Sequence, residues 1–140
     1  MINLFIANML VTTFMFGVIT LTQFVTYPLL LNVKFSNFQS YHDSYVKKIF
    51  LIVAPVMIIE LLLGLYILFI DKTYLSILNL ILIGVIFAST IFLQVPIHEI
   101  IKSGKDVNKI NKLIKTNLIR SSMWLIKVFV SYKLLFKEVV

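Results

Sequence analysis

The feature that most constrains this chain is a series of long apolar stretches that are almost free of charge. Residues 1–33 contain no charged side chain, residues 50–70 contain only Glu60, and residues 74–97 again contain none. A helix needs about 20 mostly apolar residues to cross the hydrocarbon core of a bilayer. Each stretch is long enough, so the sequence predicts three membrane-spanning helices. The first is too long for a signal peptide and lacks its basic start, so we expect it to be retained.

A fourth apolar stretch, residues 118–130, is interrupted by Arg120 and Lys127. Both side chains are long enough to run along apolar surface toward polar surroundings, and Lys127 could instead face a partner. We therefore predict one all-α domain over residues 1–140, an integral membrane four-helix bundle with up-down-up-down topology. Its spans cover about residues 2–31, 48–70, 74–98 and 112–134, with an interfacial segment between the first two. No repeat is evident.

Composition agrees with a membrane protein and excludes several other classes. The chain is 60% hydrophobic and 14% charged and has no cysteine, whereas soluble domains average about 45–50% apolar and about 25% charged residues. A soluble enzyme, a disordered tail and a disulfide scaffold are excluded. The net charge of +7 is typical of basic loops beside a bilayer, and no motif indicates a nucleic-acid partner.

The connections carry residues that start and stop helices. Thr73 is placed to cap the third helix. Gly104 suits the position just after a helix, and Asp106 suits the cap of the next one. Residues 32–48 are the longest polar stretch, and their aromatic and histidine content predicts the interfacial segment.

Lysine distribution predicts the orientation in the cell inner membrane. The first and third loops hold eight lysines and the opposite side holds three, so the rule that basic loops stay inside places loops one and three in the cytoplasm and both termini outside. The first group is Lys34, Lys47, Lys48, Lys102, Lys105, Lys109, Lys112 and Lys115, and the second is Lys72, Lys133 and Lys137.

Polar residues within the spans are expected to converge. Polar groups inside a membrane usually face a bundle interior or a cavity, and here several recur at helical spacing. With the predicted topology they lie in the half of the bundle next to loops one and three, with Glu60 at the floor of a polar chamber. The set comprises Glu60, His42 and His98 as candidate catalytic residues, and Gln23, Tyr27, Tyr45, Gln94, Asn117, Arg120 and Trp124 as candidate substrate-binding residues.

Each candidate also has a purely structural explanation. Glu60 could be protonated and hydrogen-bonded across the bundle, since burial disfavours a charged carboxyl group, or it could pair with Arg120. The histidines could only cap helix ends. The glutamines could link helices by hydrogen bonds worth about 0.6 kcal/mol each. The tyrosines and Trp124 could anchor the protein at the membrane interface.

Acid–base chemistry on a hydrophobic substrate is the reaction class that best suits this set. A buried carboxyl group or a histidine can take a proton from an activated carbon or a phenol, while Arg120 and the amides hold the developing oxyanion. No cofactor is predicted. The alternative is a haem or metal site, for which His42, His98 and Glu60 are the only suitable ligands, although the Glu-x-x-His pattern of di-iron bundles is absent.

Several short motifs resemble a family of small uncharacterised bacterial four-helix membrane proteins. That family is distantly similar to the anthrone-oxygenase-like membrane proteins. The resemblance implies a four-helix membrane fold and oxidation of polycyclic phenolic substrates without an evident metal, and it carries no site residues over. The motifs are Gln23-Phe-Val-Thr-Tyr27-Pro28, Tyr41-His42 with Tyr45, Pro55 with Glu60, Gln94-Val-Pro96-Ile-His98, and Thr116-Asn117-Leu-Ile-Arg120 with Trp124.

The function predicted from the sequence is thus a cofactor-independent, oxygenase-like enzyme acting on a hydrophobic aromatic or quinone-like molecule. The competing class is non-enzymatic: a small subunit of a membrane complex, a homo-oligomer, or a protein that binds a hydrophobic ligand. Gly84 and Ala88 form a pair of small residues that could pack against a partner helix. An enzyme should bring Glu60 and a histidine to one chamber, whereas a subunit should pair its polar groups internally.

Overall fold

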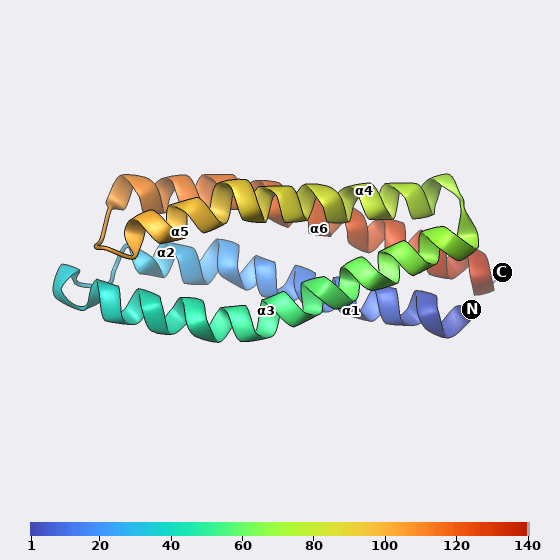
Figure 1. The fold of residues 1–140 in the computed structure, drawn as a ribbon, viewed down its shortest axis with the longest axis horizontal. Helices are drawn as coiled ribbons and strands as arrows, with labels where there is room; N and C mark the ends of the chain where they lie inside the picture. Colours follow the sequence, from blue (N-terminus) through green and yellow to red (C-terminus); the bar gives the residue numbers. More distant parts are fainter. Residues whose placement is uncertain (140) are drawn as a thin grey trace.

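The computed structural model describes residues 1–139 as a bundle of four long helices joined by short loops, with no strand in that range (Figure 1). The first helix consists of α1 (Ile2–Leu21), η1 (Thr22–Thr26) and α2 (Tyr27–Leu30). The second is α3 (Phe35–Asp71). The third consists of α4 (Tyr74–Ser89), η2 (Thr90–Gln94) and α5 (Val95–Ile101), and the fourth is α6 (Val107–Val139). The predicted four-helix bundle is confirmed.

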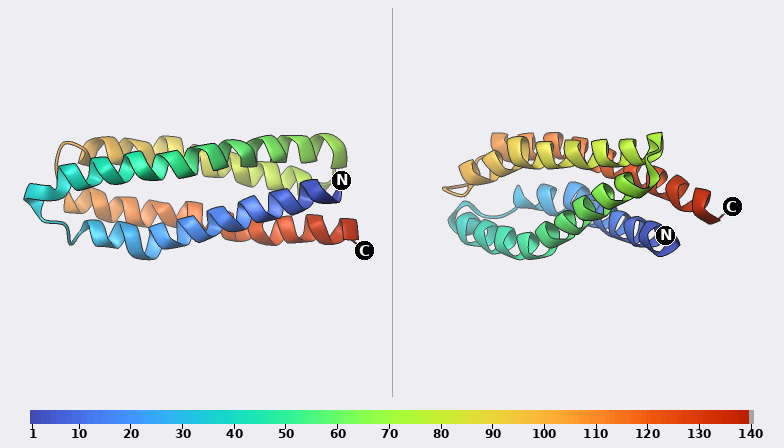
Figure 2. Two further views of the ribbon diagram at one scale, coloured as in Figure 1. Left: turned by 90° about the horizontal axis from the view of Figure 1, so that it is seen from below. Right: turned by 45° about the vertical axis from the view of Figure 1, so that its right-hand side comes forward.

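The four helices form a ring in which each packs against two neighbours. α1 and α4 lie diagonally, and each packs on both α3 and α6. The two termini and the α3–α4 turn lie at one end of the bundle, while the two loops that precede α3 and α6 lie at the other (Figure 1, Figure 2). This end, here called the loop end, is the one at which the polar residues were expected to gather.

Two π-helical segments, η1 and η2, interrupt the first and third helices at matching places. Both begin with threonine and end just before a helix that has proline in its first turn, Pro28 or Pro96. Proline lacks an amide donor and clashes with the carbonyl four residues earlier, so the wider turn accommodates it. The two segments share the pattern Thr-x-Phe-x-x-x-Pro, starting at Thr22 and Thr90.

The core consists of three apolar layers along the bundle axis. The loop-end layer is centred on Phe38, Ile101 and Leu113, the middle layer on Trp124 and Met57, and the layer near the termini is formed by Phe5, Ile67, Leu82, Val130 and Leu134. Buried polar side chains lie between these layers. The site residues are therefore held in an otherwise apolar interior.

Three of the four helices are long and apolar enough to cross a membrane: Ile2–Leu30, Phe35–Asp71 and Tyr74–Ile101. Large apolar side chains cover their outer surfaces, including Leu10, Leu51 and Phe92. Exposed apolar area of this extent marks contact with lipid or a partner. α6 runs alongside them for the length of the bundle (Figure 1), but its lysines lower its hydropathy, so the fourth span stays a prediction.

The loop predictions are correct in part. Thr73 caps α4 in a reciprocal arrangement with Ser76, and Asp106 accepts a hydrogen bond from the Lys109 amide at 3.0 Å. Gly104 does not adopt the positive φ that its predicted role requires. Residues 35–47, expected as a separate interfacial segment, are helical and continuous with the second span, because no proline or glycine interrupts them.

Candidate functional site

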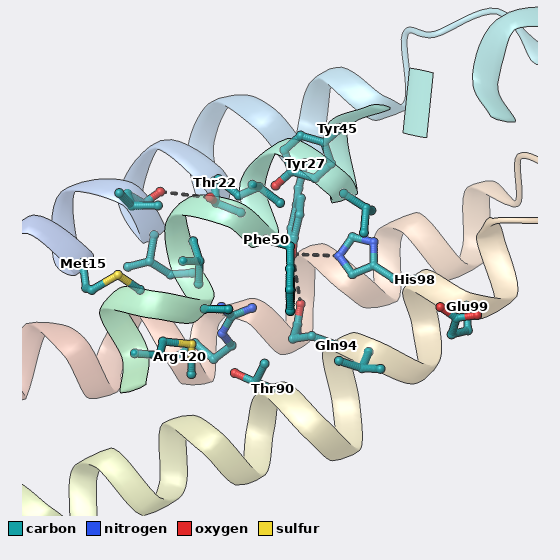
Figure 3. Close-up of a pocket in the computed structure, with 18 residues that line it drawn as sticks. Met15, Thr22, Tyr27, Tyr45, Phe50, Thr90, Gln94, His98, Glu99 and Arg120 are labelled. Carbon is teal, nitrogen blue, oxygen red and sulfur yellow. Dashed lines mark hydrogen bonds between the residues drawn. The ribbon is translucent and has the colours of Figure 1, made fainter. Parts of the chain in front are cut away.

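A cavity of about 340 Å³ lies in the loop-end half of the bundle, enclosed by the first helix, α3 and the third helix, with Arg120 of α6 also in its wall (Figure 3). Its size is within the range of about 300–1,000 Å³ that is usual for small-molecule sites. Most of its wall is apolar. The polar groups that reach it come from Thr22, Tyr27, Tyr45, Thr90, Gln94, His98, Glu99 and Arg120.

The cavity reaches the outer surface of the bundle between α3 and the third helix. Phe50 of α3 and Val95 of α5 both line it, and they are 65% and 49% exposed. The two helices diverge toward the loop end (Figure 2). Because the surrounding surface is apolar, this opening suits entry of a molecule dissolved in lipid.

Tyr27 lies at the centre of a chain of hydrogen bonds on the cavity wall. Its hydroxyl is 3.1 Å from Nε2 of His98 and 3.4 Å from Oε1 of Gln94 (Figure 3). His98 Nδ1 is in turn 2.9 Å from Nε2 of His42. Two of these side chains follow the π segments: Tyr27 comes directly after η1, and His98 lies one turn after the end of η2. The chain joins the first helix, α3 and α5.

Arg120 contributes the charge in this cavity. Its side chain is only 6% exposed, and its guanidinium points into the cavity (Figure 3). The Trp124 ring lies beneath it at 5.5 Å from the guanidinium carbon, a separation typical of cation–π contact. Among the described residues no carboxylate forms an ion pair with Arg120, and its Nε has no hydrogen-bond partner.

Five of the ten predicted site residues, Glu60, His42, Gln23, Asn117 and Trp124, do not line the cavity. Two of them, Asn117 and Gln23, bind each other. Asn117 donates to Oε1 of Gln23 at 2.8 Å, and Gln23 donates to the Ile114 carbonyl at 3.1 Å. Neither lines the cavity. This pair joins the first helix to α6, which is the interhelical role that the sequence left open for the glutamines.

Glu60 is also separate from the cavity, and its partner is Lys127 rather than Arg120. The carboxylate lies 2.9 Å from Lys127 Nζ, with both side chains at most 1% exposed. Thr12 and Trp124 donate to it at 3.1 Å each. The predicted chamber with Glu60 at its floor is therefore corrected. Lys127 lies three residues after Trp124 on α6, about one helical turn, so both side chains reach the Glu60 carboxylate.

The three residues proposed as metal ligands do not converge either. His42 and His98 hydrogen-bond to each other, while Glu60 belongs to the ion pair deeper in the bundle. Within residues 1–139 the structure contains no group of three or more His, Asp or Glu side chains arranged to hold a metal ion.

A second, more polar pocket lies beyond the histidines at the loop end. It is lined by His42, Asp43, Val46, Lys47, His98, Glu99 and Lys102. His98 therefore borders both hollows, and His42 reaches only the loop-end pocket. The histidine pair lies between the apolar cavity and a charged surface.

The roles of three residues in linking the helices were not predicted from the sequence. Thr116 accepts from Gln94 Nε2 at 2.9 Å and so orients its carbonyl toward Tyr27. Lys127 was expected either to extend toward polar surroundings or to face a partner, and its partner is Glu60. Lys105 donates to the carbonyls of Leu31 and Val33 at 2.6 and 2.7 Å and so satisfies the end of α2. Nothing in the sequence around Lys105, which follows Gly104, indicates this role.

No protein-family model, curated protein or solved structure matches this chain.

Proposed function

We propose that this membrane protein binds a lipid-soluble small molecule of the hydrophobic aromatic or quinone-like class in the cavity. The observation that carries the proposal is an apolar cavity, open at the apolar side of the bundle, with Tyr27, Gln94, His98 and Arg120 converging on it. Binding sites for small molecules combine mostly apolar walls with a few such polar groups that fix orientation.

The contacts support an oxygen-bearing head group. Arg120 offers only donors, and the Tyr27 hydroxyl can donate or accept at the same wall. A carbonyl or hydroxyl oxygen of a bound ring would satisfy the Arg120 donors. Phe50, Met57 and Val53 supply apolar contacts for the ring system.

Quenching of Trp124 fluorescence tests this proposal. Trp124 is the only tryptophan, and its ring contacts Arg120 at the cavity wall, so a quinone in the cavity lies close enough to quench it. We expect menadione to quench protein in nanodiscs with saturable binding. Ala54→Phe, which fills the cavity, should weaken binding at least tenfold.

Ala88→Phe is the matched control, because Ala88 lies on the exposed face of α4 and away from the cavity. This variant should bind menadione like the wild type. Equal quenching in all three proteins, or quenching that never saturates, would mean that menadione only dissolves in the bilayer, and the proposal would then be wrong.

A cofactor-independent, anthrone-oxygenase-like enzyme is the second candidate. It is favoured by the His98–Tyr27 hydrogen bond at the cavity wall, which supplies an acid–base pair without Glu60. Oxygen uptake with an anthrone should then depend on His98 and be lost in His98→Gln. Turnover that persists unchanged in this variant would exclude the enzyme hypothesis.

We also propose that the loop end faces the cytoplasm and that the protein resides in the cell inner membrane, because most lysines lie at that end. The chain has no cysteine, so single cysteines at Ser103 and at Asn3 report each side. A membrane-impermeant maleimide applied from outside should label Asn3→Cys and not Ser103→Cys. The reverse pattern would invert the orientation.

A further inference from the structure

Arg120 is a buried cation that forms no ion pair with any carboxylate in the described part of the chain. Of the described carboxylates, Glu99 alone lines the same cavity, and it is 67% exposed and lies 3.9 Å from Lys102. The other deep carboxylate, Glu60, is taken by Lys127. A charge in an apolar interior is unfavourable unless it is paired. The cavity thus has a fixed positive charge and space beside it for an anion.

The hydrogen-bond chain leads from this cavity to the loop-end pocket. Tyr27 lines the cavity, His98 borders both hollows, and His42 lines the loop-end pocket. The two links, Tyr27 to His98 and His98 to His42, measure 3.1 and 2.9 Å. The outermost nitrogen, His42 Nδ1, is buried and has no hydrogen-bond partner among the described residues. Its ring lines the loop-end pocket, so a water molecule in that pocket is the acceptor that the proton path requires.

From these two observations we infer that the ligand is a lipid-soluble weak acid, which enters neutral, loses its proton through Tyr27, His98 and His42, and is held as an anion by Arg120. The inference rests on the proposed function, because it concerns a ligand of the same cavity. It adds the chemical class, an acidic O–H such as that of a phenol or a carboxylic acid. A neutral form is needed for entry because an ion pays a large desolvation cost in hydrocarbon.

The proton transfer balances without any other reactant. The ligand O–H bond breaks and its proton passes to Tyr27 Oη, whose own proton moves to His98 Nε2. The proton on His98 Nδ1 moves to His42 Nε2, and the proton on His42 Nδ1 passes to water in the loop-end pocket. The net change is one ionised ligand and one proton delivered to water, with no electron transferred. Each hydrogen bond of the chain then points the other way, ready to return a proton when the ligand leaves.

The charges around the chain favour this direction. Arg120 lies at its cavity end, where it stabilises a ligand anion. At its outer end, the loop-end pocket is lined by the carboxylates of Asp43 and Glu99, which stabilise the positive charge of the released proton. The other titratable groups that face the histidines are Tyr27, Tyr45, Lys47 and Lys102.

A phenol whose absorbance changes on ionisation tests the inference. 2-Naphthol is neutral in water at pH 7, whereas its anion absorbs at longer wavelength. We expect wild-type protein in phosphatidylcholine nanodiscs to bind 2-naphthol as the anion, with one proton released per molecule bound. Empty nanodiscs should show only the neutral spectrum. 2-Methoxynaphthalene, which has no acidic proton, should bind at least tenfold more weakly.

Variants separate the two parts of the inference. Arg120→Gln should lower the bound anion fraction at least tenfold, while Arg120→Lys, which keeps a cation, should retain the anion. His98→Gln keeps Arg120, so the final anion band should persist, but its rate of appearance after rapid mixing should fall at least tenfold. A dodecanoic acid competitor distinguishes carboxylic acids from phenols, because it displaces 2-naphthol only if the site accepts both.

The outcomes are distinct from those of the proposed function. If menadione and 2-methoxynaphthalene bind in the cavity but 2-naphthol stays neutral in the wild type, the weak-acid inference is overturned and the binding function stands. An unchanged rate in His98→Gln would overturn the proton path alone. If no probe saturates, the proposed function itself fails. Because the wild-type comparison needs no variant, misfolding of a variant leaves the test intact.

Discussion

At the residue scale, the clearest division of labour is between two buried cations. Lys127 is satisfied by Glu60, Thr12 and Asn8, at 2.9, 2.5 and 3.5 Å. Among the described residues Arg120 has no carboxylate partner, and its guanidinium lies over the face of Trp124. Because the desolvation of a buried charge must be offset by partners, Lys127 is assigned to structure and Arg120 to a ligand.

This assignment predicts that Lys127→Met destabilises the protein. The substitution leaves the Glu60 carboxylate buried without its cation, and breaking a buried pair in this way costs about 3–5 kcal/mol. We expect thermal unfolding in detergent at a much lower temperature. The double variant Glu60→Gln/Lys127→Met should recover most of the loss, because neither side chain is then charged.

Lys133→Met is the matched control, since Lys133 is exposed on the same helix. It should change the melting temperature little. If Lys127→Met melts like Lys133→Met, the ion pair has no role in stability and the account of Glu60 is incorrect.

At the element scale, the π segments explain how the first and third helices turn their polar residues inward. A π turn contains an extra residue, which rotates the following side chains by about 100° relative to a regular helix, because each residue advances the helix by 1/3.6 of a turn. Tyr27 and His98 follow these turns and meet at 3.1 Å. The hydroxyls of Thr22 and Thr90 each donate to the carbonyl four residues earlier, a bond that often accompanies helix bending.

The contact between α3 and α4 depends on Gly64. A Cβ atom at this position would lie 2.5 Å from Cδ1 of Ile83 and 3.4 Å from Nδ2 of Asn79. Gly64→Ala should therefore destabilise the protein by about 1–2 kcal/mol, because overpacking typically costs about 1–3 kcal/mol and alanine regains up to about 1 kcal/mol of helix propensity. Thermal unfolding measures the difference.

Two variants check that the cause is the close contact. Ile83→Val removes the obstructing Cδ1, so Gly64→Ala should cost less in that background than in the wild type. Gly17→Ala should be neutral or stabilising, since nothing lies within 4 Å of its added carbon. Equal destabilisation by Gly64→Ala and Gly17→Ala would contradict the packing argument.

At the scale of the whole molecule, the sequence was sufficient for the fold and for part of the site. Uncharged stretches longer than a bilayer requires predict the helices directly, and a spacing of four predicts that Gln94 and His98 share a face. The structure adds which faces meet. Spacing along one helix says nothing of the partner across the bundle, so Glu60 was expected beside the histidines and lies beside Lys127 instead.

The π-helical segments account for much of the remaining difference between the predicted and the observed positions of the side chains. Helical periodicity assumes 3.6 residues per turn, and one extra residue in η1 or η2 shifts every position that follows. The signal that predicts both shifts together is the shared Thr-x-Phe-x-x-x-Pro pattern. Gly84 and Ala88, the pair of small residues on α4, are both exposed, so they do not pack within the bundle. A partner on that face stays a prediction.

The central claim is that the cavity beside Arg120 holds the polar end of a lipid-soluble ligand, and crystals grown with 6-bromo-2-naphthol test it most directly. Anomalous scattering locates the bromine, and the electron density locates the hydroxyl. We expect one bromine site among Phe50, Val53 and Met57, with the naphthol oxygen about 2.7–3.0 Å from the Arg120 guanidinium. Bromine found only on the outer, lipid-facing surface, with the cavity unoccupied at saturating ligand, would contradict the account.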